Sequence, residues 1–349
     1  MYTLDGSDPA VAGLPYTGPL TLPAQATLLR AQARQSCALP SETSQAIFRV
    51  TSAAPNPGSP PAPVQSSLHI GNSLTDTIVD YLEPLAQSGG VLLDFNRYTI
   101  PGAGTWMYAE NPSGGFGVAD VQLELKSRAF DHLTVQPFPN EPCQILASSA
   151  GPDSDSGFIN QAWTDARTQN PDVQLWVYQQ WPDPVDYTNC ITGGGWVRAD
   201  DVPSCGDVSS PSCWQPPEPA SWEEAVQNEL AYDEAIVDEL VQLQPDAPRP
   251  YIVPGGLGLS HLHAAIDAGL VPGFTNFFGQ IFQASGADIH LTKPGAYFIS
   301  LIFYACMFQS NPSATELDAS YGVTAEQARV LQAIAWETVT SYASSGVAR

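Results

Sequence analysis

The feature that most constrains the fold is a regular alternation of short apolar runs with longer stretches of helical periodicity after residue 66. The apolar runs are Ser67–Ile70, Val91–Tyr98, His132–Gln136, Gln174–Tyr178 and Tyr251–Val253. The helical stretches are Asp76–Gln87, Val118–Ala129, Phe158–Gln169, Trp222–Leu243, His261–Ala268, Ala296–Phe308 and Ala325–Tyr342. Strands that alternate with helices predict a mostly parallel, five-stranded sheet covered by helices on both faces, which is an α/β fold.

Two segments interrupt this pattern. Residues 54–67 contain five prolines and predict an extended linker at a domain boundary. We therefore divide the chain into a small all-β module at 1–52, a proline-rich linker at 53–66 and an α/β domain at 67–349. Residues of about 180–220 are rich in Pro, Trp and Cys without helical periodicity, and they predict a long insertion in that domain.

The charge of the chain excludes some classes of partner. Its 36 acidic and 12 basic residues give a formal net charge of −24. Such a surface repels nucleic-acid phosphates and anionic lipid headgroups, so we expect neither as a main partner. No stretch reaches the roughly 18 apolar residues of a membrane span, and the sequence shows no phosphate-binding glycine loop.

The six cysteines show no pattern of a zinc site. Cys190, Cys205 and Cys213 fall in the 180–220 insertion without a C-x-x-C pair or a histidine at zinc spacing. Disulfides that staple the insertion are one reading, and free thiols are the other. His261 and His263 lack a third ligand and are read as cap or surface residues, so we expect no metal and no cofactor.

A candidate nucleophile lies at the end of the first predicted strand. The strand at 68–70 runs into Gly71-Asn72-Ser73-Leu74 and then into a helix. A serine in such a turn lies at the carboxyl edge of the sheet, next to the backbone N–H groups of a helix N-terminus. Taken alone, this pattern is more typical of a helix cap.

Three further segments follow later strands or precede a helix. They are Gly102-Ala103-Gly104-Thr105, Pro139-Asn140-Glu141 and Asp288-Ile289-His290. We expect the sheet to bring them together beside Ser73, because ester cleavage needs a nucleophile, an imidazole base and donors for the oxyanion.

The order of these four segments resembles the four blocks of the SGNH (GDSL-like) hydrolase superfamily over residues 65–345. The resemblance implies a flavodoxin-like three-layer α/β/α sandwich. It implies that Ser73 is the nucleophile and His290 its base, with Asp288 as the third member of the triad. It also implies an oxyanion hole formed by the N–H groups of Ser73 and Gly104 and by the side chain of Asn140.

The sequence departs from the family pattern at three places. Asn72 stands where aspartate is usual, and Asn140 lies in Pro-Asn-Glu instead of Gly-x-Asn-Asp. Asp288 precedes His290 by two residues, whereas three are usual. A backbone carbonyl or another acid, such as Glu141, could therefore orient the imidazole in place of Asp288.

The first 52 residues carry a second resemblance. Tyr2-Thr3-Leu4-Asp5-Gly6-Ser7-Asp8-Pro9 and Leu14-Pro15-Tyr16-Thr17-Gly18-Pro19-Leu20 resemble the small β-sandwich found beside chitobiase and β-hexosaminidase catalytic domains. The usual preceding strands are absent, so the module is read as incomplete. No signal peptide begins at Met1, yet this resemblance implies an extracellular or cell-surface protein.

The predicted substrate is an ester of a glycan. The accessory module favours removal of acetyl groups from a polysaccharide, and Trp106, Trp181, Trp196 and Trp214 could provide stacking surfaces for sugars. These tryptophans could equally fill space in an irregular region. The alternatives are a short-chain or aryl esterase, and a non-catalytic carbohydrate-binding or adhesion protein with a decayed active site.

Overall fold

The computed structural model divides into two compact units, Met1–Pro61 and Ala62–Arg349. The described residues are 1–4, 9–18, 20, 27–34, 41, 44–48, 64–137, 154–185, 187 and 219–348. Within the first unit, the strands β1 (Tyr2–Thr3), β2 (Thr27–Ala31) and β3 (Ser44–Phe48) form an antiparallel sheet in that order. A four-residue helix, α1 (Pro9–Ala12), follows β1.

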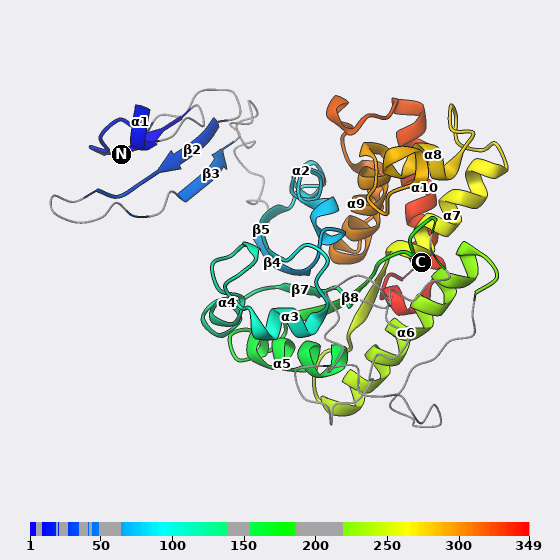
Figure 1. The fold of residues 1–349 in the computed structure, drawn as a ribbon, viewed down its shortest axis with the longest axis horizontal. Helices are drawn as coiled ribbons and strands as arrows, with labels where there is room; N and C mark the ends of the chain where they lie inside the picture. Colours follow the sequence, from blue (N-terminus) through cyan, green and yellow to red (C-terminus); the bar gives the residue numbers. More distant parts are fainter. Residues whose placement is uncertain are drawn as a thin grey trace, which may run out of the picture. The chain divides into compact units, whose positions relative to one another are not determined.

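The second unit is built on a six-stranded sheet with the order β6-β5-β4-β7-β8-β9 (Figure 1). Its strands are β4 (Val64–Gly71), β5 (Leu92–Thr99), β6 (Phe116–Gly117), β7 (His132–Val135), β8 (Gln174–Gln179) and β9 (Tyr251–Pro254). Five are parallel, and the two-residue β6 adds an antiparallel edge to β5. Counted along the chain, the parallel strands lie in the order 2-1-3-4-5, which is the flavodoxin-like arrangement. The predicted fold class is confirmed.

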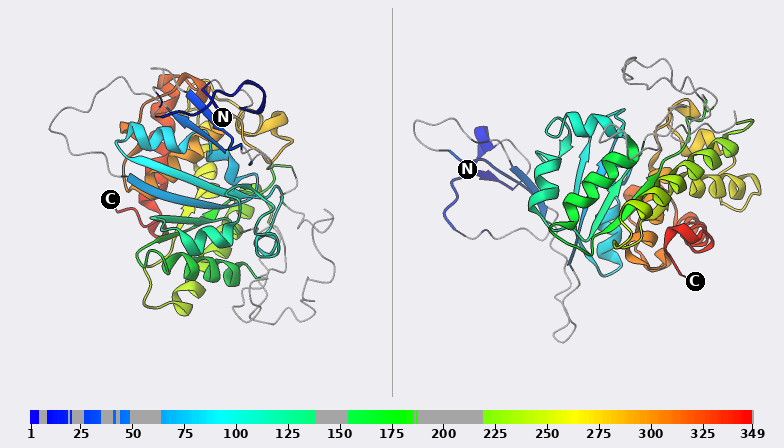
Figure 2. Two further views of the ribbon diagram at one scale, coloured as in Figure 1. Left: turned by 90° about the vertical axis from the view of Figure 1, so that its left-hand side faces the viewer. Right: turned by 90° about the horizontal axis from the view of Figure 1, so that it is seen from below.

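Helices cover both faces of this sheet, as the views in Figure 2 show. The helices are α2 (Leu82–Ser88), α3 (Thr105–Glu110), α4 (Val121–Ser127), α5 (Asp155–Arg167), α6 (Trp222–Leu243), α7 (Gly255–Asp267), α8 (Phe277–Ile281), α9 (Lys293–Phe308) and α10 (Ala325–Ser341). One core lies between the sheet and α2, α7, α8, α9 and α10, and a second lies between the sheet and α3, α4 and α5, while α6 contributes side chains to both. In β8, Trp176 and Tyr178 enter the first core while Leu175 and Val177 enter the second.

Two helices differ from the sequence prediction for identifiable reasons. The predicted helix at 76–87 is split into a 3-10 turn, η1 (Thr75–Ile78), and α2. Pro84 explains the break, because a proline fits the first turn of a helix but not its interior. Helix α7 begins six residues before His261, at Gly255. A Cβ on Gly256 would lie 2.4 Å from the carbonyl oxygen of Gln180, so only glycine lets this helix start so close to β8.

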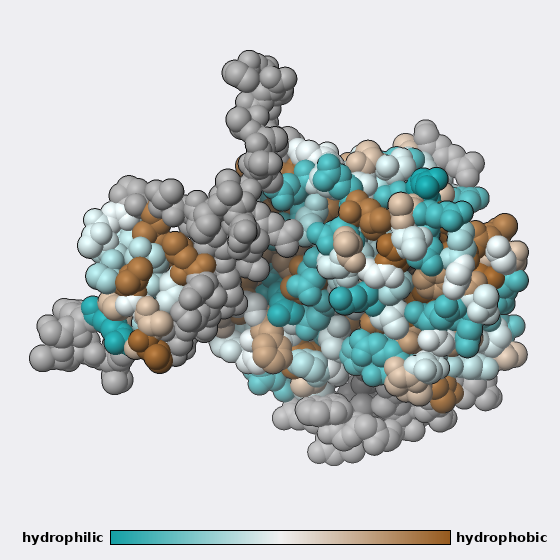
Figure 3. All heavy atoms as spheres, turned by 90° about the horizontal axis from the view of Figure 1, so that it is seen from above, coloured by the Kyte–Doolittle hydropathy of each residue, from teal (hydrophilic) through white to brown (hydrophobic). Residues whose placement is uncertain are grey.

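Predicted helix caps are present. The Ser221 side chain accepts a hydrogen bond from Glu224 N, and Thr324 and Gln327 form a reciprocal capping box. Polar residues separate the apolar patches on the face shown in Figure 3. Within the described ranges, no helix combines the length and the hydrophobicity needed to cross a membrane.

Candidate active site

The turn between β4 and η1 presents Ser73 at the carboxyl edge of the sheet. The side chain of Asn72 closes this turn, because its Oδ1 accepts a hydrogen bond from Leu74 N at 2.9 Å. Gly71 is required here, since a Cβ would lie 2.0 Å from Thr75 Oγ1. Ser73 itself remains partly exposed. A ligand can therefore reach its hydroxyl group.

The imidazole of His290 joins Ser73 across 217 residues of sequence. Its Nε2 lies 2.9 Å from Ser73 Oγ, and its Nδ1 lies 2.6 Å from Asp288 Oδ1. A carboxylate at Nδ1 requires a proton on that nitrogen, which leaves Nε2 of the neutral ring as an acceptor. His290 is thereby oriented to take the proton of the Ser73 hydroxyl.

The two-residue spacing between Asp288 and His290 is compatible with this contact. Asp288 Oδ1 accepts hydrogen bonds from both the backbone N–H of His290, at 2.9 Å, and its ring. These two bonds, the backbone bond first, lower the pKa of the Asp288 carboxyl. The carboxylate of Asp288 thus contacts His290 directly, in the role for which Glu141 was considered as an alternative. Glu141 lies outside the described residues.

The loop that carries His290 is held at both of its ends. Gln283 N donates to His290 O at 2.8 Å, and Thr292 N donates to Ile281 O at 2.8 Å. Ala284, at a φ of 48°, and Ser285, at 57°, have the left-handed conformation that non-glycine residues rarely adopt. Such strained positions persist where the surrounding structure fixes them, which fits a loop that has to hold one imidazole in place.

Two of the three predicted oxyanion donors can be located. Gly104 is buried and has an extended backbone at the N-cap of α3, in the loop that follows β5. The backbone N–H groups of Ser73 and Gly104 donate to no acceptor among the residues that the structure describes. Unpaired N–H groups next to a nucleophile are what an oxyanion hole requires. Asn140 falls outside the described residues.

The tryptophans differ from the prediction in one respect. Trp181 is fully buried, so its face cannot stack on a sugar. Instead, its indole N–H donates to Ile289 O at 2.8 Å. Trp106 lies at the start of α3, half-buried, and stays a candidate contact residue. Trp196 and Trp214 lie outside the described part of the chain.

The remaining histidines have local partners. His261 Nδ1 lies 2.9 Å from Thr338 Oγ1, and His263 Nδ1 lies 2.6 Å from Glu223 Oε1. Burial, with a smaller effect of His132, lowers the pKa of His69 to about 3, so this core histidine is neutral. Among the described residues, no group of three or more His, Cys, Asp or Glu side chains could hold a metal ion.

Disulfides cannot be assigned from the described residues. Cys306 is a free, buried thiol in α9, and burial raises its pKa. The other five cysteines, including Cys190, Cys205 and Cys213, lie outside the described ranges. The predicted stapling of the insertion therefore stays a prediction.

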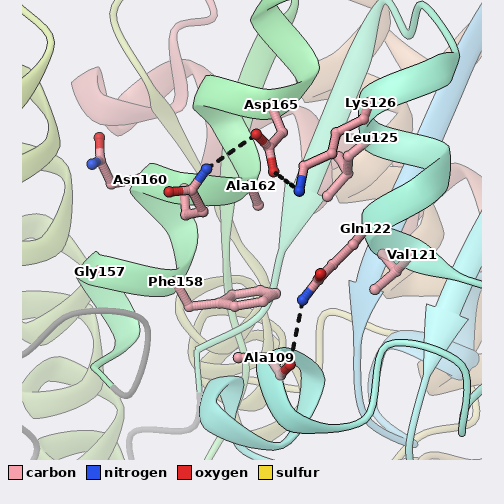
Figure 4. A pocket seen from close by; sticks show the side chains of 11 residues that line it. Ala109, Val121, Gln122, Leu125, Lys126, Gly157, Phe158, Asn160, Ala162 and Asp165 are labelled. Carbon is pink, nitrogen blue, oxygen red and sulfur yellow. Dashed lines mark hydrogen bonds and ion pairs between the residues drawn. The ribbon is translucent and has the colours of Figure 1, made fainter.

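A cavity of about 390 Å³ lies between α3, α4 and α5, and none of the triad residues lines it (Figure 4). Its polar side chains bind one another: Asp165 pairs with Lys126 at 3.5 Å and with Gln161 at 3.0 Å. Gln122 donates to the carbonyl oxygen of Ala109 at 3.3 Å. The cavity therefore lies apart from the contacts between Ser73, His290 and Asp288.

Sequence reasoning missed the buried amides that support the Ser73 turn. Gln136 directly follows β7 and Gln180 directly follows β8, and both are almost fully buried. They lie at the same carboxyl edge of the parallel sheet as Ser73, at the ends of two other strands. A polar residue directly after a buried apolar strand was the signal that could have identified them.

Comparisons with known proteins agree with the architecture. The family model described as Fn3 associated matches residues 1–48. A DUF4886 family protein from Bacteroides uniformis is similar in structure, with a TM-score of 0.53 and 14% identity over 79% of this chain and 95% of the other. This likeness supports the fold alone. No curated protein sequence matches the chain.

Two further solved structures show smaller overlaps. A candidate SGNH hydrolase from Slackia heliotrinireducens has a TM-score of 0.36 and 16% identity over 69% of this chain and 97% of the other. A candidate GDSL-like lipase from Parabacteroides merdae has a TM-score of 0.37 and 9% identity over 71% of this chain and 98% of the other. The second unit is a three-layer α/β/α sandwich whose polar strand-end residues lie at one edge of the sheet.

Proposed function

We propose that this chain is a serine esterase that hydrolyses carboxylic esters through an acyl-enzyme. The observation that carries the proposal is the chain of contacts from Ser73 Oγ to His290 Nε2, at 2.9 Å, and from His290 Nδ1 to Asp288 Oδ1, at 2.6 Å. These are the contacts by which an imidazole activates a hydroxyl nucleophile.

The proton transfers of the reaction use these groups and water. His290 Nε2 takes the proton of the Ser73 hydroxyl as Oγ forms a bond to the ester carbonyl carbon. The tetrahedral intermediate collapses, the bond to the alcohol oxygen breaks, and His290 returns the proton to that oxygen. Water then attacks the acyl-enzyme by the same route, which releases the acid and restores Ser73.

The negative charge on the carbonyl oxygen would be stabilised by fixed donors. The N–H groups of Ser73 and Gly104 are available for this role, and we assign the side chain of Asn140 as the third donor. Loss of one such donor typically lowers turnover by about 10²–10³. Because the backbone donors are held by the fold, they need no reorganisation during the reaction.

An O-acetylated polysaccharide is the substrate class that we favour. The support for it is the small β-unit that precedes the α/β unit, together with Trp196 and Trp214, the two tryptophans of the 180–220 insertion that remain predicted sugar contacts. The net charge of −24 disfavours strongly anionic substrates. We further propose that the protein acts outside the cell or at its surface, where such polymers are found.

Release of nitrophenol from nitrophenyl acetate tests the reaction. Wild type should show a burst of about one equivalent if deacylation is slow, or steady turnover if it is fast, whereas Ser73→Ala should show neither. If wild type and Ser73→Ala are equally inert while both bind a glycan, the protein is a carbohydrate-binding protein instead.

The substrate class needs a separate comparison. Acetate released from an acetylated polysaccharide is measured beside nitrophenyl esters of increasing chain length, all with the full chain. Turnover on the polymer that exceeds turnover on the nitrophenyl esters supports the deacetylase. Activity on nitrophenyl esters alone would make the protein a short-chain or aryl esterase.

A further inference from the structure

Three buried primary amides lie next to one another at the ends of β4, β7 and β8. They belong to Asn72, Gln136 and Gln180, which are 2%, 1% and 0% exposed. Gln136 is at the centre of the group: its Nε2 lies 3.0 Å from Asn72 Oδ1 and 2.6 Å from Gln180 Oε1. Its Oε1 accepts from Asn72 N at 3.3 Å and from Thr75 Oγ1 at 2.5 Å.

Two backbone groups determine how all three amides are oriented. The N–H of Asn72 can only donate, so the oxygen of the Gln136 amide must face it. The N–H of Leu74 can only donate, so the oxygen of the Asn72 amide must face that group. It follows that Gln136 Nε2 donates to Asn72 Oδ1, and that Gln180 presents its oxygen to the same nitrogen.

The central amide connects the two loops that carry the proposed oxyanion donors. Asn72 immediately precedes Ser73, and its Nδ2 donates to Ala103 O at 3.4 Å. Ala103 immediately precedes Gly104. Gln136 therefore holds Asn72, the residue directly before Ser73, which is joined to the residue directly before Gly104.

This network contains a buried group that lowers the stability of the folded state, so stability alone does not explain why the network is present. Gln180 Oε1 accepts from Gln136, whereas Gln180 Nε2 is buried and finds no acceptor among the described residues. A buried donor without a partner destabilises the folded state. Networks that retain such a group at the edge of a site are candidates for a functional role.

We infer that Gln136 is a positioning residue that fixes the oxyanion donors of Ser73 and Gly104 through Asn72. The inference rests on the proposed esterase function. Donors held in place contribute to turnover, and a displacement of about 1 Å is enough to lower it substantially. Gln136 contacts neither the nucleophile nor the base, so its effect is on placement.

The chain offers a matched control in Gln179. This glutamine is also fully buried, and its Nε2 donates to Val226 O at 3.1 Å while its Oε1 accepts from Leu257 N at 2.9 Å. It ties β8 to α6 and α7, and neither of these hydrogen bonds reaches the loops of Ser73 or Gly104. Substitution of Gln179 thus removes an equal number of buried polar atoms away from the proposed site.

The test compares Gln136→Met with Gln179→Met in the full-length protein, with nitrophenyl acetate as substrate. We expect Gln136→Met to lower kcat by about 10- to 100-fold with KM within about threefold of wild type. Gln179→Met should lower the melting temperature to a similar extent and leave kcat within about threefold.

The variant Gln136→Glu provides a second test. Glutamate has the same shape as glutamine, so this substitution leaves the packing of the side chain unchanged. Its carboxylate keeps the acceptor for Asn72 N–H but turns a second oxygen towards Asn72 Oδ1 and Gln180 Oε1. Protonation restores one donor at that position. The ratio of its kcat to that of wild type should therefore rise as the pH falls from about 8 to about 6.

The outcomes distinguish the positioning role of Gln136 from the proposed esterase function. If wild type is active and Gln136→Met loses no more kcat than Gln179→Met, the positioning role is wrong and the esterase function stands. A ratio for Gln136→Glu that does not change with pH also overturns the role. If folded wild type neither turns over the ester nor is acylated, the esterase proposal fails and this inference fails with it.

Discussion

Trp181 donates its indole N–H to the carbonyl oxygen of Ile289, at 2.8 Å, one residue before His290. The indole is fully buried in the core beside Tyr178, and it follows the end of β8. The irregular loop that carries the imidazole is therefore anchored to the sheet. This contact explains why a tryptophan in the insertion is a support for the base instead of a surface for sugars.

Loss of the hydrogen bond from Trp181 to Ile289 should lower kcat, because the loop that carries His290 is then less firmly held. Trp181→Phe retains an aromatic ring but removes the donor to Ile289, so His290 should lose its fixed position. We expect kcat for nitrophenyl acetate to fall by about tenfold or more, because misplacement of a base costs rate directly. Trp163→Phe is the control, since the buried indole N–H of Trp163 has no acceptor among the described residues. Equal kcat losses in the two variants would reject the anchoring role.

Asp288→Asn should separate orientation of the base from folding. An amide cannot stabilise the imidazolium that forms during attack, so we expect kcat to fall by at least about tenfold, and by up to about 10⁴-fold. The folded-state pKa of Asp288 is lowered by its bonds to His290, so any stability it adds is present at neutral pH and is lost as the pH falls below about 4. Its side chain is 39% exposed, so thermal melting at neutral pH should change little. Turnover close to that of wild type would assign the orientation of His290 to another group.

A buried acid in α6 should make the protein less stable as the pH rises. Burial first, and then the charges of Glu229, Asp155 and Glu234, raise the pKa of Asp233 well above its ordinary value. Because its folded-state pKa exceeds its unfolded one, Asp233 favours folding at low pH, and this contribution is lost as the pH rises through the folded pKa. We expect Asp233→Asn to raise the melting temperature relative to wild type, and the gain to grow between about pH 5 and about pH 8.

Asp238→Asn is the matched control for this prediction. Asp238 lies on the same helix, but its side chain is 72% exposed. Its substitution should move the melting temperature little at any pH. A parallel response of the two variants would show that the helix as a whole, and not the buried carboxyl group of Asp233, sets the pH dependence.

The sequence predicted the architecture because the strands are buried on both faces. Runs such as Gln174–Tyr178 are apolar at nearly every position, and this pattern is typical of a parallel sheet with helices on both sides. The two helices whose starts differ from the prediction are each set by a single residue. Pro84 moves the start of α2, and the close approach of Gly256 to Gln180 O allows α7 to begin earlier than its periodicity indicates.

The predicted site was limited in a different way. The strand-end rule pointed to Ser73 and to the loop of Gly104, and the resemblance in the order of the four segments pointed to His290. The way in which Asp288 reaches His290 could not be predicted, because it depends on a backbone turn that brings one oxygen to two donors. The buried environments of Asp233 and Gln136 are likewise set by tertiary packing and leave only a weak periodic signal in the sequence.

The central claim, that Ser73 is a nucleophile activated by His290, is tested most directly by covalent labelling. The folded protein is treated with a fluorophosphonate, and the labelled peptide is identified by mass spectrometry. We predict a single adduct on Ser73 in wild type, and no adduct at the same reagent concentration in Ser73→Ala or His290→Ala. An adduct on another residue, or equal labelling of wild type and Ser73→Ala, would contradict the account.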